Sequence, residues 1–307
     1  MKSNRRQFIN AVAGSAALGL ISSTTNALQD LPISCNSYNW LTFYGRQNKN
    51  WGEDLEANVS DLTKTGITSY EPGLSSVEDV KKLAPILQKY KIQMPSVYVN
   101  SVLHKAEDAE LSIKSVLAIA DEVKKLGTKI MVTNPSPIKW GGAELKSDSE
   151  LIVQAKNVEK LGAALRQKGI TLAYHTHDVE LRAGAREFHH VLQNTSPQNV
   201  AFCFDVHWVY RGSQDSQVAV FDVLKMYGKR IVELHIRQSV GGVWSETFGD
   251  GDIDYRRLAR ELKAMNIRPH LVIEQCIEAK TPNTMDGVQA HVKDLAMIKE
   301  IFKPILG

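Results

Sequence analysis

Apolar and polar positions follow two different periods along this chain. Short apolar runs rich in β-branched and aromatic residues predict strands, and longer segments with apolar residues three or four apart predict helices. The strands are predicted near residues 33–37, 67–70, 93–98, 129–133, 170–174, 200–204, 230–234 and 269–273. The most regular helical patterns run through residues 106–126 and 149–168. Strand and helix therefore alternate along nearly the whole chain.

This alternation favours an α/β fold, a (β/α)8 TIM barrel, with residues 28–307 as one catalytic domain. Several predicted helices end in a cationic turn followed by Gly or Asn, as at Gly127, Gly169 and Asn266, which is typical of helix C-termini. No linker or change of composition divides the chain. An open doubly wound sheet is the alternative, but no glycine-rich turn follows the first predicted strand.

Five residues of types that commonly bind metal ions follow the apolar runs of the second half of the chain. They are His175, His177, Asp205, His235 and Glu274. In a parallel barrel the carboxyl ends of the strands meet at one face, so these side chains are expected to converge. Imidazole and carboxylate groups brought together in this way predict a site for a divalent metal ion.

The N-terminus has the pattern of an export signal. Arg5 and Arg6 precede Phe8 and Ile9, and a short apolar stretch over residues 11–21 leads to small residues and a cleavage point after Ala27. That stretch is too short to span a bilayer. Residues 1–27 are therefore predicted to be a twin-arginine signal peptide that directs the protein to the periplasm.

Charge and cysteine content narrow the function classes. The formal net charge of the chain is +3, and Lys2, Arg5 and Arg6 in the predicted signal account for it. The remainder is close to neutral, and no run of Lys and Arg interleaved with aromatic residues predicts nucleic-acid binding. The three cysteines, at positions 35, 203 and 276, lack C-x-x-C spacing and could form at most one disulfide, so the fold is not predicted to be held by disulfides.

Several motifs resemble those of a known family. They are Tyr174-His175-Thr176-His177-Asp178-Val179-Glu180-Leu181, Phe204-Asp205-Val206-His207-Trp208-Val209, Glu233-Leu234-His235-Ile236-Arg237, Gly249-Asp250-Gly251-Asp252-Ile253-Asp254 and Val272-Ile273-Glu274-Gln275. Together and in this order, they resemble the sugar phosphate isomerase/epimerase group of xylose isomerase-like TIM barrels. The resemblance covers essentially the whole chain after the signal.

The resemblance implies one divalent metal ion, Mn, Co, Mg, Ni or Zn, bound by residues from strands five to eight. Asp205, His235 and Glu274 match the family's ligands, but strand five carries His175 and His177 where many epimerases have glutamate. Both imidazoles are expected on one face of the strand, so either can bind the metal. His177 is favoured as the ligand because it lies nearer the barrel mouth. Glu274, His175 and Glu180 are the candidate catalytic residues.

Other residues near the strand ends are candidates for substrate binding. Glu71 follows the second predicted strand, Arg237 lies two residues beyond His235, and His207 and Trp208 follow Asp205. Each has an ordinary structural alternative, an ion pair for Glu71 and Arg237, a polar rim position for His207 and core packing for Trp208. Further aromatic residues in the strand-end loops, among them Trp140, can contact the apolar faces of a sugar.

The expected chemistry is metal-assisted proton abstraction next to a carbonyl of an unphosphorylated keto-sugar, giving isomerisation or epimerisation. Elimination of the aglycone from a 3-keto-glycoside is an alternative, because strand five lacks the second glutamate base. A catalytically silent sugar-binding subunit is a further alternative, and an endonuclease IV-like nuclease is disfavoured. The partners expected besides a carbohydrate are a second copy of the chain or an oxidoreductase, with no membrane span after signal removal.

Overall fold

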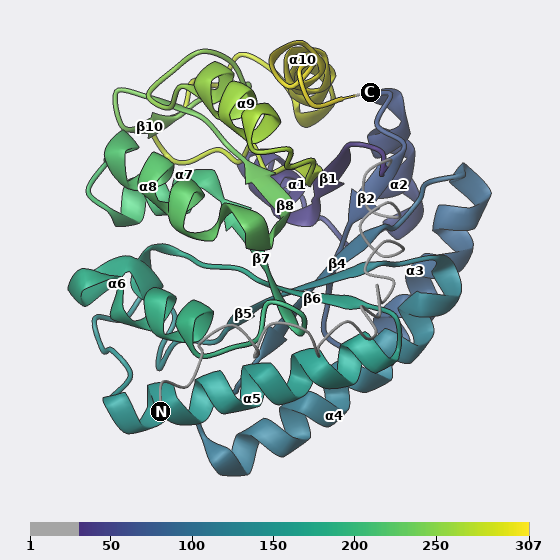
Figure 1. Cartoon of the computed structure of the whole chain (residues 1–307). Coiled ribbons are helices and arrows are strands. Elements are labelled where there is room, and N and C mark those ends of the chain that lie inside the picture. Colours follow the sequence, from purple (N-terminus) through teal and green to yellow (C-terminus); the bar gives the residue numbers. More distant parts are fainter. Residues whose placement is uncertain (1–30, 307) are drawn as a thin grey trace, which may run out of the picture.

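Parallel strands form a ring at the centre of the computed structural model, which describes residues 31–306 (Figure 1). The sheet order is β2-β1-β11-β8-β7-β6-β5-β4-β3, and every pairing within it is parallel. The strands are β1 (Ser34–Asn36), β2 (Ser69–Glu71), β3 (Gly73–Leu74), β4 (Ser96–Ser101), β5 (Ile130–Pro135), β6 (Thr171–Tyr174), β7 (Val200–Asp205), β8 (Ile231–Ile236) and β11 (His270–Ile273).

The two ends of this sheet are consecutive in the chain, so the ring closes. β2 pairs with β1, and β3 pairs with β4. Only Pro72 separates β2 from β3 in the chain. Because proline has no backbone N–H, it interrupts the ladder, while its carbonyl still accepts a bond from Tyr98 N at 2.9 Å. β2 and β3 are therefore two parts of one barrel strand, and the predicted TIM barrel is confirmed.

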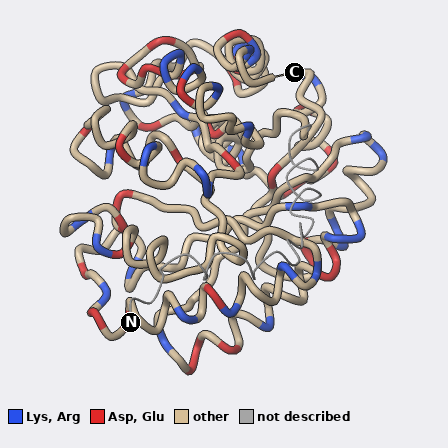
Figure 2. The backbone as a smooth tube through the Cα atoms, viewed as in Figure 1, with Lys and Arg blue, Asp and Glu red and all other residues tan. Residues whose placement is uncertain are grey.

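Helices surround the ring and cover its outer face (Figure 1). They are α1 (Ser37–Arg46), α2 (Leu55–Lys64), α3 (Val77–Tyr90), α4 (Ala106–Val123), α5 (Asp148–Gln167), α6 (Asp178–Gln193), α7 (Val206–Gly212), α8 (Gln217–Tyr227), α9 (Tyr255–Ala264) and α10 (Gly287–Ile301). Lysine, arginine and acidic residues are interspersed along these outer helices (Figure 2).

Local sequence signals explain where these helices begin and end. Ser147 and Glu150 form a reciprocal capping box at the start of α5, and Asp254 caps α9 by accepting from Arg257 N at 2.7 Å. Gly127 and Gly169, at two of the predicted helix stops, have φ of 90° and 76°. These left-handed positions favour glycine and end the helices where the pattern predicted.

Three details differ from the sequence prediction. β4 begins at Ser96, three residues later than predicted, because Pro95 precedes it and donates no ladder bond. The helix α7 was not predicted and begins directly after Asp205, whose carboxylate accepts from Trp208 N at 2.7 Å. A small hairpin of β9 (Ser239–Val240) and β10 (Val243–Trp244) follows β8, and Asp252 accepts bonds from Gly241 N and Gly242 N.

The predicted export signal, residues 1–27, lies outside the described residues. Across residues 31–306, no helix combines the length and the apolar character that crossing a membrane requires.

Candidate metal centre and active site

Four side chains from neighbouring strand ends converge inside the mouth of the barrel. His175, Asp205, His235 and Glu274 each offer a ligand atom, and these atoms all lie within 4.8 Å of one another. His175 follows β6, Asp205 ends β7, His235 lies in β8 and Glu274 follows β11. All four are buried. The ring order β6, β7, β8, β11 thus brings together residues that are up to about a hundred positions apart.

Unpaired buried atoms in this cluster fit a bound cation. Within the described part of the chain, both ring nitrogens of His175, Oδ2 of Asp205 and Nδ1 of His235 have no hydrogen-bond partner. Leaving such atoms buried without a partner is costly, and nitrogen and carboxylate oxygen are common ligands of divalent ions. Burial, together with the nearby His235, lowers the pKa of His175 to about 3, so its imidazole is in the neutral, ligating form.

His177 lies outside this four-residue group, contrary to the assignment favoured from the sequence. β6 ends at Tyr174, and the chain has left the strand before it reaches His177, which precedes the first residue of α6. The ring of His177 lies beside that of His175, with centroids 4.9 Å apart, and also contacts Trp140 and Trp208. The two imidazoles share a side as expected, but His175 is the deeper one and His177 lines the cavity above it.

Arg237 binds the acidic members of the cluster. Its Nη2 lies 2.7 Å from Glu274 Oε2 and 3.7 Å from Asp205 Oδ2. The guanidinium also stacks on the rings of Trp244 and Trp208, at 4.3 and 5.1 Å from their centroids. Burial alone would raise the pKa of Glu274, but Arg237 and then His235 outweigh it and hold that pKa well below its usual value. Arg237 therefore keeps Glu274 ionised.

A second buried polar layer lies beneath the cluster and holds His235 from behind. His235 Nε2 lies 3.1 Å from Glu71 Oε2 and 3.4 Å from Glu233 Oε1, while Nδ1 lies 3.4 Å from Glu274 Oε2. Glu233 Oε2 also pairs with His270 Nδ1 at 2.7 Å. Glu71 was expected to bind substrate, but it is fully buried, and its partners are His235 and Asn36. It orients the His235 imidazole instead.

Cys203, Glu233 and His235 form another buried trio with ligand atoms close together. The Cys203 thiol donates to Glu233 at 3.6 Å, and Glu233 is already paired with His270. Burial raises the pKa of Cys203 well above its usual value, which disfavours the thiolate that a metal would need. This trio is therefore better described as part of the supporting layer.

Glu180 and His207 also differ from their expected roles. The Glu180 carboxylate accepts from His177 N at 2.7 Å and from Asn134 Nδ2 at 3.0 Å, so it caps α6 and is fully buried. Burial, followed by the charge of Glu187, raises its pKa to about 7. His207 is fully buried and pairs with Ser239 Oγ at 3.0 Å. Among the described residues, neither is part of the cavity lining.

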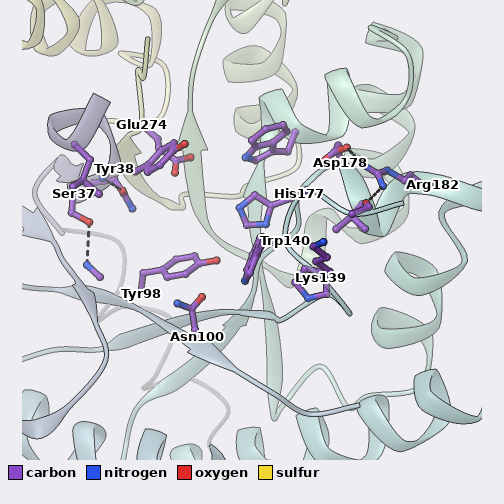
Figure 3. Close-up of a pocket in the computed structure, with 18 residues that line it drawn as sticks. Ser37, Tyr38, Tyr98, Asn100, Lys139, Trp140, His177, Asp178, Arg182 and Glu274 are labelled. Atoms are coloured by element: carbon purple, nitrogen blue, oxygen red, sulfur yellow. Dashed lines mark hydrogen bonds and ion pairs between the residues drawn. The ribbon is translucent and has the colours of Figure 1, made fainter. Parts of the chain in front are cut away.

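A cavity of about 650 Å³ includes Glu274 of the cluster in its wall. Figure 3 shows the side chains that line it. Glu274 is the member of the four-residue group that also lines it, and His177 and the predicted Trp208 are in its wall. Residues that the sequence analysis did not single out complete the lining, among them Asn36, Tyr38, Tyr98, Asn100, Asp178 and Arg182. Most belong to the ends of β1 and β4 and the start of α6, where polar residues without a regular period gave no signal.

Comparison with known proteins agrees with this geometry. Residues 59–301 match the family model described as xylose isomerase-like TIM barrel. An inosose dehydratase of Clostridium perfringens is 24% identical over 275 residues, covering 80% of this chain and 89% of that protein. An inosose dehydratase of Mesomycoplasma hyopneumoniae is 23% identical over 256 residues, covering 74% of this chain and 83% of that protein.

Solved structures share the fold at lower identity. A sugar phosphate isomerase/epimerase of Parabacteroides distasonis superposes with a TM-score of 0.66 at 18% identity, covering 95% of this chain and 100% of that one. An L-ribulose 3-epimerase gives a TM-score of 0.66 at 14% identity, covering 89% and 95%. Since the family model matches most of the sequence, the chain belongs to the xylose isomerase-like TIM barrel family.

Proposed function

We propose that this protein is a sugar-modifying enzyme that depends on a divalent metal ion and abstracts a proton next to a carbonyl of an unphosphorylated keto-sugar or cyclitol. The observation that carries the proposal is the convergence of His175, Asp205, His235 and Glu274, with unpaired ligand atoms, at the floor of a cavity. The naming of relatives as inosose dehydratases and of structural neighbours as sugar epimerases supports the same substrate class.

A bound ion would polarise the substrate carbonyl and stabilise the negative charge left when the neighbouring C–H loses its proton. Glu274 is the proposed base, because its carboxylate is ionised and faces the cavity. Arg237 fixes that carboxylate from behind, and Glu71 fixes His235. His177 presents a neutral imidazole on another side of the cavity, since burial and then His175 lower its pKa to about 3.

Two outcomes of this proton abstraction are available. Return of the proton to carbon gives isomerisation or epimerisation. In elimination, the C–H electron pair forms a C=C bond, the C–O bond on the next carbon breaks, and the leaving oxygen takes up the proton that Glu274 received. Elimination is the favoured outcome because two-base epimerisation needs an effective second base opposite Glu274. His177 lies on another side of the cavity, but its lowered pKa of about 3 makes it a poor base.

The proposal of an unphosphorylated substrate rests on the predicted export of the protein, not on the charges of the cavity. Two cationic side chains line the cavity, Lys139 and Arg182, and Arg182 pairs with Asp178 at 2.7 Å and donates to the Gly142 carbonyl at 2.9 Å. The twin-arginine motif at Arg5 and Arg6 supports export to the periplasm. Phosphorylated sugars are scarce in that compartment. Cell fractionation of the wild type and of a variant with both arginines replaced by lysine tests this location.

Proton NMR in D2O tests the reaction. The metal-loaded enzyme, incubated with keto-sugars, inososes and 3-keto-glycosides, is expected to introduce deuterium next to a carbonyl or to release a substituent. Glu274→Gln is expected to slow this by at least about a hundredfold, the effect of losing a general base. Absence of both exchange and release across all three substrate classes would overturn the proposal.

A further inference from the structure

The two ends of the active-site cavity differ in chemistry. Its inner end carries Glu274, Asn36 and His177 and lies over the cluster. At its mouth, three large apolar side chains are exposed, Tyr38 by 45%, Leu41 by 44% and Trp140 by 53%. Tyr38 lies on the Glu274 side and Trp140 lies beside His177 (Figure 3). The mouth thus presents aromatic surface on two sides, and the charged side chains of Lys139, Asp178 and Arg182 also line the cavity.

The size of the cavity exceeds the need of a single sugar ring. Its volume of about 650 Å³ falls within the ~300–1,000 Å³ that holds drug-sized ligands. A keto-sugar bound through its oxygens at the inner end would leave the apolar mouth unfilled.

The loop that carries Trp140 is held firmly in place. At its end, Lys146 is buried and pairs with Glu187 at 2.6 Å, while its ammonium also donates to the Pro135 carbonyl at 3.2 Å. In its middle, the Gly142 carbonyl accepts from Arg182. Gln154 adds a bond of 2.8 Å to Glu187. The backbone of the loop that carries the exposed indole is therefore anchored, which lowers the entropic cost of ordering this loop around a ligand.

We infer that the mouth of the cavity is a subsite for an apolar, planar group attached to the reacting sugar, so that the substrate is an aryl glycoside in which the sugar has been oxidised. Exposed aromatic surface continuous with an active site is characteristic of ligand binding. The inference rests on the proposed function, because the sugar ring must occupy the inner end. In the elimination described above, the aryl group is the part that leaves, as a phenol.

Binding of matched glycoside pairs tests the subsite without turnover. The probes are the methyl and 4-nitrophenyl α- and β-glycosides of glucose and galactose, measured by equilibrium dialysis against the purified protein. We expect at least one 4-nitrophenyl glycoside to bind about tenfold more tightly than its methyl partner. Trp140→Ala is expected to remove this preference and leave the affinity for the methyl glycoside within about twofold.

Leu111→Ala is the matched control, because Leu111 is 72% exposed on α4, outside the cavity lining. It is expected to keep the preference, and thermal unfolding verifies that both variants are folded. Equal affinities within every pair, or a preference that survives in Trp140→Ala, would overturn the inference. If the preference is found but no D2O exchange occurs, the subsite stands and the proposed reaction fails. Exchange without the preference would support the reaction and overturn the subsite.

Discussion

Two buried polar layers stacked inside the barrel differ in how their atoms are paired. In the upper layer, His175, Asp205 and His235 turn unpaired atoms toward a common point near Glu274. In the lower layer, Glu233 is bonded to His270, whose Nε2 in turn reaches Ser34 Oγ at 2.9 Å. Burial is the same in both, so burial alone does not identify a reactive site. What distinguishes the upper layer is that buried atoms without a hydrogen-bond partner converge on one point.

The lower layer also explains how the upper one is held. His235 belongs to both, with Nε2 fixed by Glu71 and Glu233 and Nδ1 left for the cluster. A carboxylate behind a metal-binding imidazole sets its tautomer and orientation. Mutations in the lower layer should therefore lower the free energy of unfolding or weaken metal affinity indirectly. Mutations in the upper layer should remove a metal ligand directly.

The largest effect on stability is expected from His270→Ala. Removing this imidazole leaves the Glu233 carboxylate in a fully buried place without its 2.7 Å partner. Leaving a buried carboxylate without its hydrogen-bond partner costs about 3 kcal/mol or more. Urea unfolding should show this loss, whereas His190→Ala, at a half-buried position on α6, should stay within about 0.5 kcal/mol of wild type. A small loss in both variants would show that the lower layer is not a structural unit.

A somewhat smaller effect is expected from the titration of Glu180. Its pKa is raised from 4.5 to about 7 in the folded protein, first by burial and then by Glu187. The stability it contributes is fully present below its unfolded pKa and is lost as the pH rises through the folded value. Between pH 4 and pH 8, wild type should lose about 3 kcal/mol of unfolding free energy relative to Glu180→Gln. Parallel pH profiles of the two proteins, measured by urea unfolding, would contradict this environment for Glu180.

Glu71→Gln should separate orientation from stability. The amide fills the same space but does not attract the His235 N–H as a carboxylate does, so metal affinity should fall about 10–100-fold. Isothermal titration with Mn²⁺, Co²⁺ and Zn²⁺ measures this change. Glu246→Gln is a suitable control, since Glu246 is buried but binds Arg46 and Thr284 rather than the cluster. Unchanged metal affinity in Glu71→Gln would show that Glu71 does not orient His235 for metal binding.

The fold was predictable from sequence because each barrel strand is a short apolar run and each helix has clear end signals. A barrel was also favoured because strands and helices alternate without an intervening linker. Strand limits were less certain where proline interrupts a ladder, as at Pro72 and Pro95. The strands of the hairpin β9–β10 have two residues each, too few for an alternation of apolar and polar residues to predict them.

The sequence predicted some residues of the cluster but not which strand-five histidine belongs to it. Asp205, His235 and Glu274 end apolar strands, which is a strong signal, and all three meet in the cluster. The rings of His175 and His177 lie side by side, but β6 stops at Tyr174, so strand alternation does not determine which of the two is deeper. Glu233 gave a signal that was overlooked, since it shares a strand face with His235 and Arg237 at a spacing of two.

The most direct test of the central claim is the metal content and affinity of three proteins, wild type, His175→Ala and His177→Ala, by elemental analysis and titration calorimetry. Wild type is expected to bind one divalent ion per chain. His175→Ala should lose at least about a hundredfold in affinity, and His177→Ala should stay within a few fold because its ring lies outside the cluster. A wild type that binds no ion, or a loss confined to His177→Ala, would contradict the metal centre described here.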